Sequence, residues 1–177
     1  MKKFTFLKSL VMLFALCLIS TGAAWAQTEQ TVTFDISSYG VSKGTSLADH
    51  PLTEAPITVS AAETSGTPLR FWGSDADAHL RIYQNNQLII AAEEGIQILE
   101  IVFSRSLPSF NVSEGTLSGD TWTGSAQSVT FTKTNSGNIE ISEIAVTYAA
   151  PAGFVAPPNF FTGTRYVQSG TVARIGD

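Results

Sequence analysis

Cysteine and histidine are scarce in this chain, and so are charges. Its 177 residues include one cysteine and two histidines, and 14% are charged, with ten Lys and Arg against fifteen Asp and Glu. So few charges exclude a coiled coil, and a hydrophobic content of 44% excludes a disordered chain. An acidic balance without a basic run excludes the electrostatic surface of a nucleic-acid-binding protein. The length allows one domain, or one domain and a fragment.

Residues 1–26 have the composition of a secretory signal peptide. Three lysines among the first eight residues precede an apolar run over 10–19, and Ala24 and Ala26 supply small residues at −3 and −1 of a cleavage site. The alternative, a membrane anchor, needs about 20 apolar residues, and this run is shorter. We therefore expect an exported chain that begins at Gln27 and a secreted or cell-surface location.

Cys17 lies inside that apolar run, after Leu16 and before Leu18. A lipoprotein signal would end its apolar run at the cysteine, after a small residue, so we expect no lipid attachment. Removal of the leader leaves no cysteine, which excludes disulfides, zinc thiolate sites and thiol catalysis. It also removes three lysines, and the exported chain then has seven Lys and Arg against fifteen Asp and Glu, a formal charge of −8.

From residue 27 onward, apolar and polar residues alternate, which is typical of half-buried strands. The alternation is clear over 31–36, 57–61, 80–82 and 129–131, and clusters of Gly, Ser, Asn, Asp and Pro separate these segments. Short strands at this spacing predict an all-β domain, an antiparallel β-sandwich, over residues 27–148.

Two stretches, 96–103 and 139–146, share the pattern Ile-x-Ile-x-Glu-Ile. Strict alternation would place Ile98 and Ile101, and likewise Ile141 and Ile144, on opposite faces of a strand. A β-bulge of one residue would return each pair to a common face, whereas a strand buried on both sides would need no bulge. We predict a bulge in each of two equivalent core strands.

Several segments occur in the order seen in a known module. They are Thr-Val-Thr-Phe-Asp at 31–35, Leu-Arg-Ile-Tyr at 80–83, Asn-Gln-Leu-Ile-Ile-Ala at 86–91, residues 98–104, Gly-Asp-Thr-Trp-Thr-Gly at 119–124, Val-Thr-Phe-Thr at 129–132 and residues 141–148. In this order they resemble a β-sandwich accessory module of secreted and surface proteins of Bacteroidota, which is similar to a jelly roll with carbohydrate-binding-like architecture. The resemblance implies a jelly-roll-like fold and an extracellular setting, and it supplies no catalytic residues.

Residues 149–177 differ in composition from the domain before them. Three prolines within the uncharged segment 149–158 predict an extended linker. The segments 160–163, 166 and 170–175 resemble the opening strands of an immunoglobulin-like repeat that is too short to bury a core. We interpret the tail as a Pro-rich linker and an incomplete or truncated repeat, with packing on the first domain as the alternative.

The sequence carries little catalytic signal. Neither histidine has a metal-ligand spacing, and there is no nucleophile elbow or phosphate loop. Glycoside hydrolysis needs two carboxylates that face each other, whereas Glu100 and Glu143 occupy matching places in the two similar stretches, which favours a structural or solvated role. His79 is interpreted as a polar residue at a strand end. We expect that the protein is not an enzyme.

Asp75 and Asp77 are the best candidates for a cation site. Two carboxylates in one loop supply the oxygen ligands that Ca²⁺ prefers, but the longer acidic loop motif is missing, and Asp is common in turns for conformational reasons. Calcium is the one cofactor that the sequence suggests.

Aromatic side chains beside guanidinium and amide groups are the remaining functional signal. Sugar-binding modules stack pyranose rings on Trp and Tyr and hold the hydroxyls with polar side chains. The ligand-binding residues predicted in this way are Trp72, Arg70, Tyr83, Asn85 and Asn86. The alternative is that the rings fill the core, which we favour for Trp122.

Two functions from different classes fit these observations. The first is a non-catalytic binding or adhesion module, with a glycan or another cell-surface component as partner. The second is a structural spacer of a larger secreted protein, and a glycoside hydrolase is a distant third. We expect no nucleic-acid partner, no transmembrane segment after cleavage, and a monomer.

Overall fold

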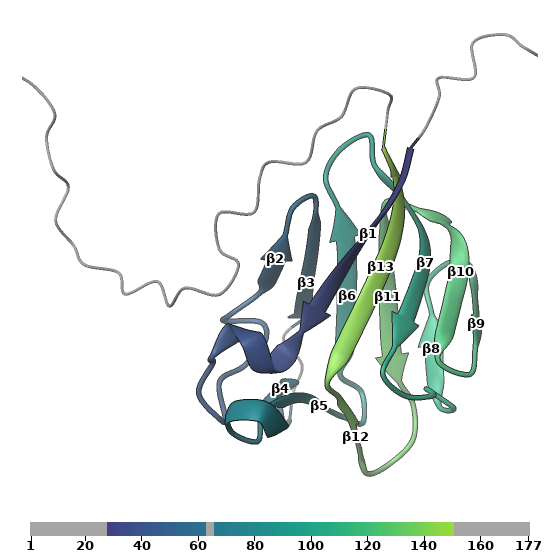
Figure 1. Ribbon diagram of the computed structural model, residues 1–177. Coiled ribbons are helices and arrows are strands. Elements are labelled where there is room, and N and C mark those ends of the chain that lie inside the picture. The colour runs from purple at the N-terminus through teal and green to yellow at the C-terminus, as the bar shows by residue number, and fades with distance from the viewer. Residues whose placement is uncertain (1–27, 63–65, 151–177) are drawn as a thin grey trace, which may run out of the picture.

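The computed structural model describes residues 28–62 and 66–150, which form thirteen strands and two short 3-10 helices (Figure 1). The predicted signal peptide and the tail beyond residue 150 lie outside the described residues. Strand β13 ends at Ala150, two residues past the boundary predicted at 148.

Two five-stranded antiparallel sheets form the two layers of the molecule. The first has the order β1, β13, β7, β10, β9, with the bounds Thr28–Asp35, Glu143–Ala150, Gln97–Phe103, Thr121–Ala126 and Thr116–Ser118. The second has the order β2, β3, β6, β11, β8, with the bounds Leu52–Glu54, Ile57–Ala62, Gln87–Ala92, Ser128–Lys133 and Phe110–Val112. Figure 1 shows the first sheet in front of the second.

A third sheet of three antiparallel strands has the order β12 (Asn138–Ile141), β5 (His79–Tyr83), β4 (Arg70–Trp72). The helix η1 (Ile36–Tyr39) follows β1, and η2 (Asp75–Asp77) joins β4 to β5. In Figure 1 the third sheet lies at the lower end of the sandwich, and the paired ends of β1 and β13 lie at the upper end. Thr28 is the register partner of Ala150 at that upper end.

The core lies between the two layers because each strand alternates apolar and polar residues. In β11, Val129 and Phe131 are fully buried and their polar neighbours face outward. Phe131 meets Phe103 of β7 edge to face, with 5.0 Å between ring centroids, so this contact joins the two sheets. Burial of each such side chain stabilises the fold by about 1.5–3 kcal/mol. The predicted all-β antiparallel sandwich is confirmed.

The predicted bulge is present in β7. Glu100 pairs with Thr147 of β13 and Ile98 pairs with Tyr148, so Leu99 is an extra residue without a partner. Ile98 and Ile101 are therefore both buried in the core.

The prediction of a second bulge, in 139–146, is wrong. The chain leaves the third sheet after Ile141 and enters the first sheet at Glu143, so Ile141 and Ile144 are buried in two different sheets. Ser142 forms the corner: its N–H donates to Ser104 Oγ at 3.0 Å and its carbonyl accepts from the Ile36 N–H at 3.0 Å. A change of sheet restores the inward direction of the side chains as a bulge would.

Trp122 of β10 is fully buried, as predicted. Its indole N–H donates to the carbonyl of Glu114 at 2.6 Å. Gly115 and Gly124 lie against the ring, and a Cβ atom at either position would be 2.6 Å from a ring atom. The glycines around Trp122 are therefore required by close approach.

Within the described residues, no helix has the length and apolarity needed to span a membrane.

Candidate functional site

The outward face of the third sheet gathers charged and aromatic side chains. Phe71 of β4 and Leu80 and Ile82 of β5 point into the core. The residues that alternate with them on these two strands therefore point outward. We call this surface the basic face and define it by its residues, which are Lys43, Arg70, Trp72, His79, Arg81, Tyr83 and Glu140. The register places Trp72 opposite His79, Arg70 opposite Arg81, and Arg81 opposite Glu140.

Lys43 joins the basic face because a loop closes the outer edge of β4. The Gly44 N–H donates to the Phe71 carbonyl at 2.8 Å, the Phe71 N–H donates to the Thr45 carbonyl at 2.9 Å, and the Leu47 N–H donates to the Leu69 carbonyl at 3.0 Å. These bonds satisfy the edge of the strand. They also hold the exposed Lys43 beside the half-buried Trp72.

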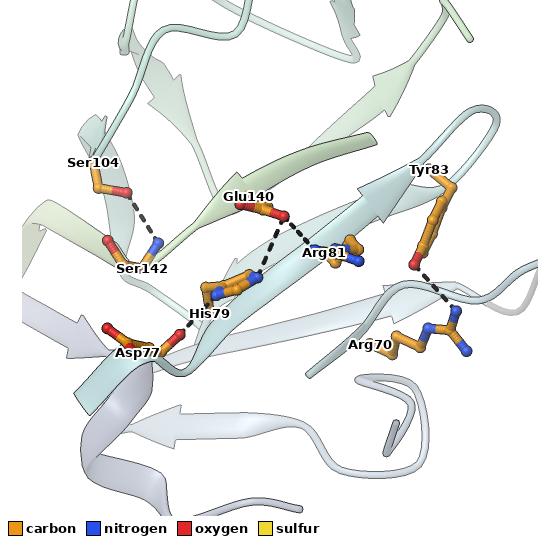
Figure 2. Close-up of polar contacts among 8 residues, drawn as sticks. All are labelled: Arg70, Asp77, His79, Arg81, Tyr83, Ser104, Glu140 and Ser142. Carbon is orange, nitrogen blue, oxygen red and sulfur yellow. Dashed lines mark hydrogen bonds and ion pairs between the residues drawn. The ribbon is translucent and has the colours of Figure 1, made fainter. Parts of the chain in front are cut away.

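Three cations surround the ring of Trp72. Lys43 Nζ lies 4.1 Å from the ring centroid, and the guanidinium carbons of Arg81 and Arg70 lie at 4.4 and 5.0 Å. Arg70 also lies 5.3 Å from the ring of Tyr83, and its Nη2 donates to the Tyr83 hydroxyl at 3.1 Å (Figure 2). Each cation–π contact at an exposed site contributes about 0.5–1 kcal/mol. The aromatic rings therefore order the cations of the basic face.

One carboxylate, Glu140, lies among these cations. Arg81 Nη2 donates to Glu140 Oε1 at 2.5 Å, and His79 Nε2 lies 3.5 Å from the same oxygen. His79 Nδ1 is 2.7 Å from the Asp77 carbonyl oxygen and donates to it (Figure 2). The hydrogen bond from Arg81 lowers the pKa of Glu140 below its ordinary value, against the opposite effect of partial burial, and nearby Arg105 adds to the lowering. Glu140 is therefore ionised at neutral pH.

An open depression of about 330 Å³ adjoins the basic face. Its lining residues are His79, Ser104, Arg105, Glu140 and Ser142. Figure 2 shows Ser104 and Ser142 on the side of Glu140 away from Arg81. The depression extends the charged surface from the third sheet toward Arg105, which follows β7.

The basic face contrasts with the charge of the domain around it. The described residues include five Lys and Arg against thirteen Asp and Glu. Lys43, Arg70 and Arg81 belong to the basic face, and Arg105 lines the adjoining depression. The fifth, Lys133, is buried, and its Nζ donates to the carbonyls of Asn135 and Ser136. Burial lowers the pKa of Lys133. Four of the five cations thus gather at one end of an acidic domain.

The structure brings together three of the five predicted ligand-binding residues, Arg70, Trp72 and Tyr83. Asn85 is exposed in the turn after β5 and has a φ of 67°, a left-handed conformation that Asn tolerates. Its N–H donates to the Lys133 carbonyl at 2.9 Å, so the turn that carries it is fixed.

Asn86 leaves the predicted ligand-binding set because it is 1% exposed. Its Oδ1 accepts from the Tyr83 N–H at 2.8 Å, and its Nδ2 donates to the Thr67 carbonyl at 2.9 Å. The chain reverses between β5 and β6, and the buried amide supplies the hydrogen bonds that the turn itself does not make. Asn86 is therefore part of the scaffold beneath the basic face.

The calcium hypothesis for Asp75 and Asp77 receives no further support. Asp77 is exposed in η2, and its carbonyl already accepts the hydrogen bond from His79. The Asp75 side chain lies outside the described part of the structure. Among the residues that are described, no group of three or more His, Cys, Asp or Glu side chains could hold a metal ion.

Sequence reasoning did not place Lys43, Arg81, Arg105 or Glu140 at this site, although Glu140 was among the carboxylates available for hydrolysis. A signal for Arg81 was available, because the alternation that buries Leu80 and Ile82 places Arg81 on the same face as Tyr83. The position of Lys43 depends on hydrogen bonds between residues 44–47 and residues 69–71, which no local pattern indicates.

The chain matches no family model, no curated protein and no solved structure. The resemblance to the Bacteroidota module and to an immunoglobulin-like repeat therefore stays a prediction.

Proposed function

We propose that this protein is a secreted or cell-surface module that binds polysaccharide, without catalysis, through the basic face. The observation that carries the proposal is the convergence of Trp72, Tyr83 and Arg70 on the outward side of one small sheet. Aromatic rings and guanidinium groups on strands are held more rigidly than the same groups on loops, which favours recognition of an extended chain.

The carboxylates considered for hydrolysis do not support an enzyme. Glu143, at the start of β13, lies opposite Ser104. Glu100 of β7 lies opposite Thr147 of β13, on the same face of the sheet as Glu143. Their backbone positions are four ladder steps apart on neighbouring strands of one sheet, about 13 Å at the usual rise per residue, and the two side chains extend from the same face rather than toward each other. Glycosidases place their two carboxyl groups about 5–9.5 Å apart across a cleft. Binding without hydrolysis is the function that this arrangement favours.

Affinity electrophoresis tests the proposal directly. The full chain and its Trp72→Ala variant are run through gels that contain neutral or acidic polysaccharides, with Thr123→Ala on the outer face of β10 as a surface control. We expect retention of the wild type and the control on at least one polysaccharide, and a loss of about tenfold or more in affinity for Trp72→Ala. Equal thermal unfolding of the variants shows that the fold is intact.

Two results would overturn the proposal. Absence of retention on every polysaccharide would favour the structural spacer. Full retention of Trp72→Ala would place the binding site elsewhere on the domain.

A further inference from the structure

We infer that the ligand of the basic face is an acidic polysaccharide, a sugar chain that carries carboxylate or sulfate groups. This inference rests on the proposed function and names the ligand class of the same site. It depends on three observations about the charges of the face.

The first observation is that two cations of the basic face lie directly opposite each other, and the face has too few carboxylates to neutralise its cations. Arg70 and Arg81 are direct register partners on β4 and β5. Like charges directly opposite each other in an antiparallel pair destabilise a sheet. Glu140 pairs with Arg81, whereas Arg70 forms no ion pair within the described residues. An anion bound beside Arg70 would relieve this repulsion.

The second observation concerns the ring of Trp72. Three cations lie 4.1–5.0 Å from its centroid, so the indole is already engaged by side chains of the protein itself. A neutral sugar that stacks on this ring would have to displace charged groups. A carboxylate or sulfate would instead bind the cations that the ring orders. Trp72 therefore acts as the support of an anion-binding surface.

The third observation is the hydrogen-bonding capacity that remains. Arg70 Nε and Arg81 Nε are buried from solvent and have no acceptor among the residues that the structure describes, so an anion reaches these donors only if the guanidinium groups shift as it binds. Guanidinium groups bind planar oxyanions through two parallel N–H donors, which makes Arg better suited than Lys to carboxylate and sulfate. The neighbouring depression adds Arg105 and the hydroxyl of Ser142, which suits a ligand that continues past one sugar.

The acidity of the domain favours a polyanion with widely spaced charges. Double-stranded DNA carries one charge for about every 1.7 Å, and thirteen acidic residues would repel a polymer of that density. A sugar chain with one anionic group on each residue, or fewer, presents its charges farther apart. It could engage four cations at one end of the domain and keep the rest of its charge away from the acidic surfaces.

Matched polysaccharides separate charge from sugar. We would measure retention of the full chain on dextran and on dextran sulfate of low substitution, with no more than one sulfate on each residue, which differ in sulfate. The second pair is methyl-esterified pectin and polygalacturonate, which differ in free carboxylate. Retention is expected on at least one acidic member and at least tenfold weaker on its neutral counterpart. The two pairs identify which anion is bound. For the acidic member that is retained, raising salt from 50 to 200 mM should weaken binding by at least about tenfold, the factor that about two neutralised charges would give.

The test variants are Arg70→Gln and Lys43→Gln, and the control is Arg174→Gln, which changes the net charge equally in the segment outside the described residues. We expect at least a fivefold loss of affinity for each test variant and no change for the control. Arg70→Lys should be intermediate because it keeps the charge and loses the paired donors. Lys43 is exposed, so Lys43→Gln carries the test if Arg70→Gln fails to fold.

The outcomes distinguish the two proposals. Retention on neutral and acidic members alike, lost in Trp72→Ala, would keep the proposed function and overturn the acidic ligand. Absence of retention on all four would overturn both. Unchanged affinity of both test variants, or tighter binding to poly(dT) than to either acidic polysaccharide, would overturn this inference.

Discussion

Gly124 allows a test of how tightly the core closes around Trp122. A Cβ atom at Gly124 would lie 2.6 Å from Trp122 Cζ2 and 3.2 Å from the Gly115 Cα, so neither a flexible side chain nor open space can absorb it. Overpacking of this kind costs about 1–3 kcal/mol, and the reduced entropy of the unfolded chain returns about 0.4–1 kcal/mol. We expect Gly124→Ala to lower the unfolding free energy by about 2 kcal/mol. This value lies toward the upper end of the range that remains when the entropy gain is subtracted from the overpacking cost.

Two further glycines separate steric overlap from backbone strain. Gly119 has a φ of 65°, and a Cβ atom added there would have no atom within 4 Å beyond the adjoining residues of the chain, so Gly119→Ala introduces strain alone, with a net cost of about 0.5–1 kcal/mol. Gly115 combines a φ of 72° with the same 2.6 Å overlap, and Gly115→Ala should cost about 3 kcal/mol.

Urea unfolding of the three variants, followed by far-UV circular dichroism, measures these differences, and each kcal/mol should lower Tm by roughly 4 °C. The smaller ring in Trp122→Phe should relieve the overlap, so the double variant with Gly124→Ala should be more stable than the sum of the single effects predicts. A cost for Gly124→Ala no larger than that for Gly119→Ala, or simple additivity with Trp122→Phe, would refute the reasoning.

Three other predictions concern titration and buried hydrogen bonds. The lowered pKa of Glu140 stabilises the fold above about pH 4.5 and this stabilisation is lost as pH falls, so Glu140→Gln should flatten the decline of Tm between pH 6 and 3; an unchanged slope would contradict the pairing with Arg81. Burial and then the hydrogen bond to Glu54 raise the pKa of Tyr39, so its stabilisation is present below about pH 10 and lost above it. Tyr39→Phe should therefore cost about 1–2 kcal/mol in urea at pH 7 and weaken the alkaline decline. Asn86→Ala should lower the unfolding free energy, measured in urea, by about 2–4 kcal/mol, because the Tyr83 N–H and the Thr67 carbonyl lose their hydrogen bonds to the side chain. A cost below about 1 kcal/mol would refute the structural role of Asn86.

Period-two alternation explains why the sandwich could be predicted from the sequence. A strand with one buried face has a local signature, and Val129 and Phe131 display it. The slipped pattern shared by 96–103 and 139–146 indicated, in both stretches, a change in the phase of the residues that face the core. It could not distinguish a bulge at Leu99 from a change of sheet at Ser142, because both return an isoleucine to the core.

The candidate site was predicted only where its residues belong to single strands. Arg70, Trp72 and Tyr83 stood out because aromatic and polar residues are adjacent in the sequence. Asn86 had the same local appearance as Asn85, and its burial depends on Thr67, nineteen residues away. The cluster of cations depends on which strands are neighbours, and that is a property of topology rather than of local sequence.

The pairing of the start of β1 with the end of β13 has a mechanical consequence. Thr28 and Ala150 are register partners at the end of the sandwich opposite the third sheet (Figure 1). Tension applied to both ends of the domain would separate β1 from β13 one hydrogen bond at a time, as a zipper opens. Tension between a ligand on the third sheet and either Thr28 or Ala150 would instead run along β1 or β13 and load all of their hydrogen bonds together. The domain should therefore open at a lower force when it is pulled through Thr28 and Ala150 than when it is pulled between the third sheet and either of these residues.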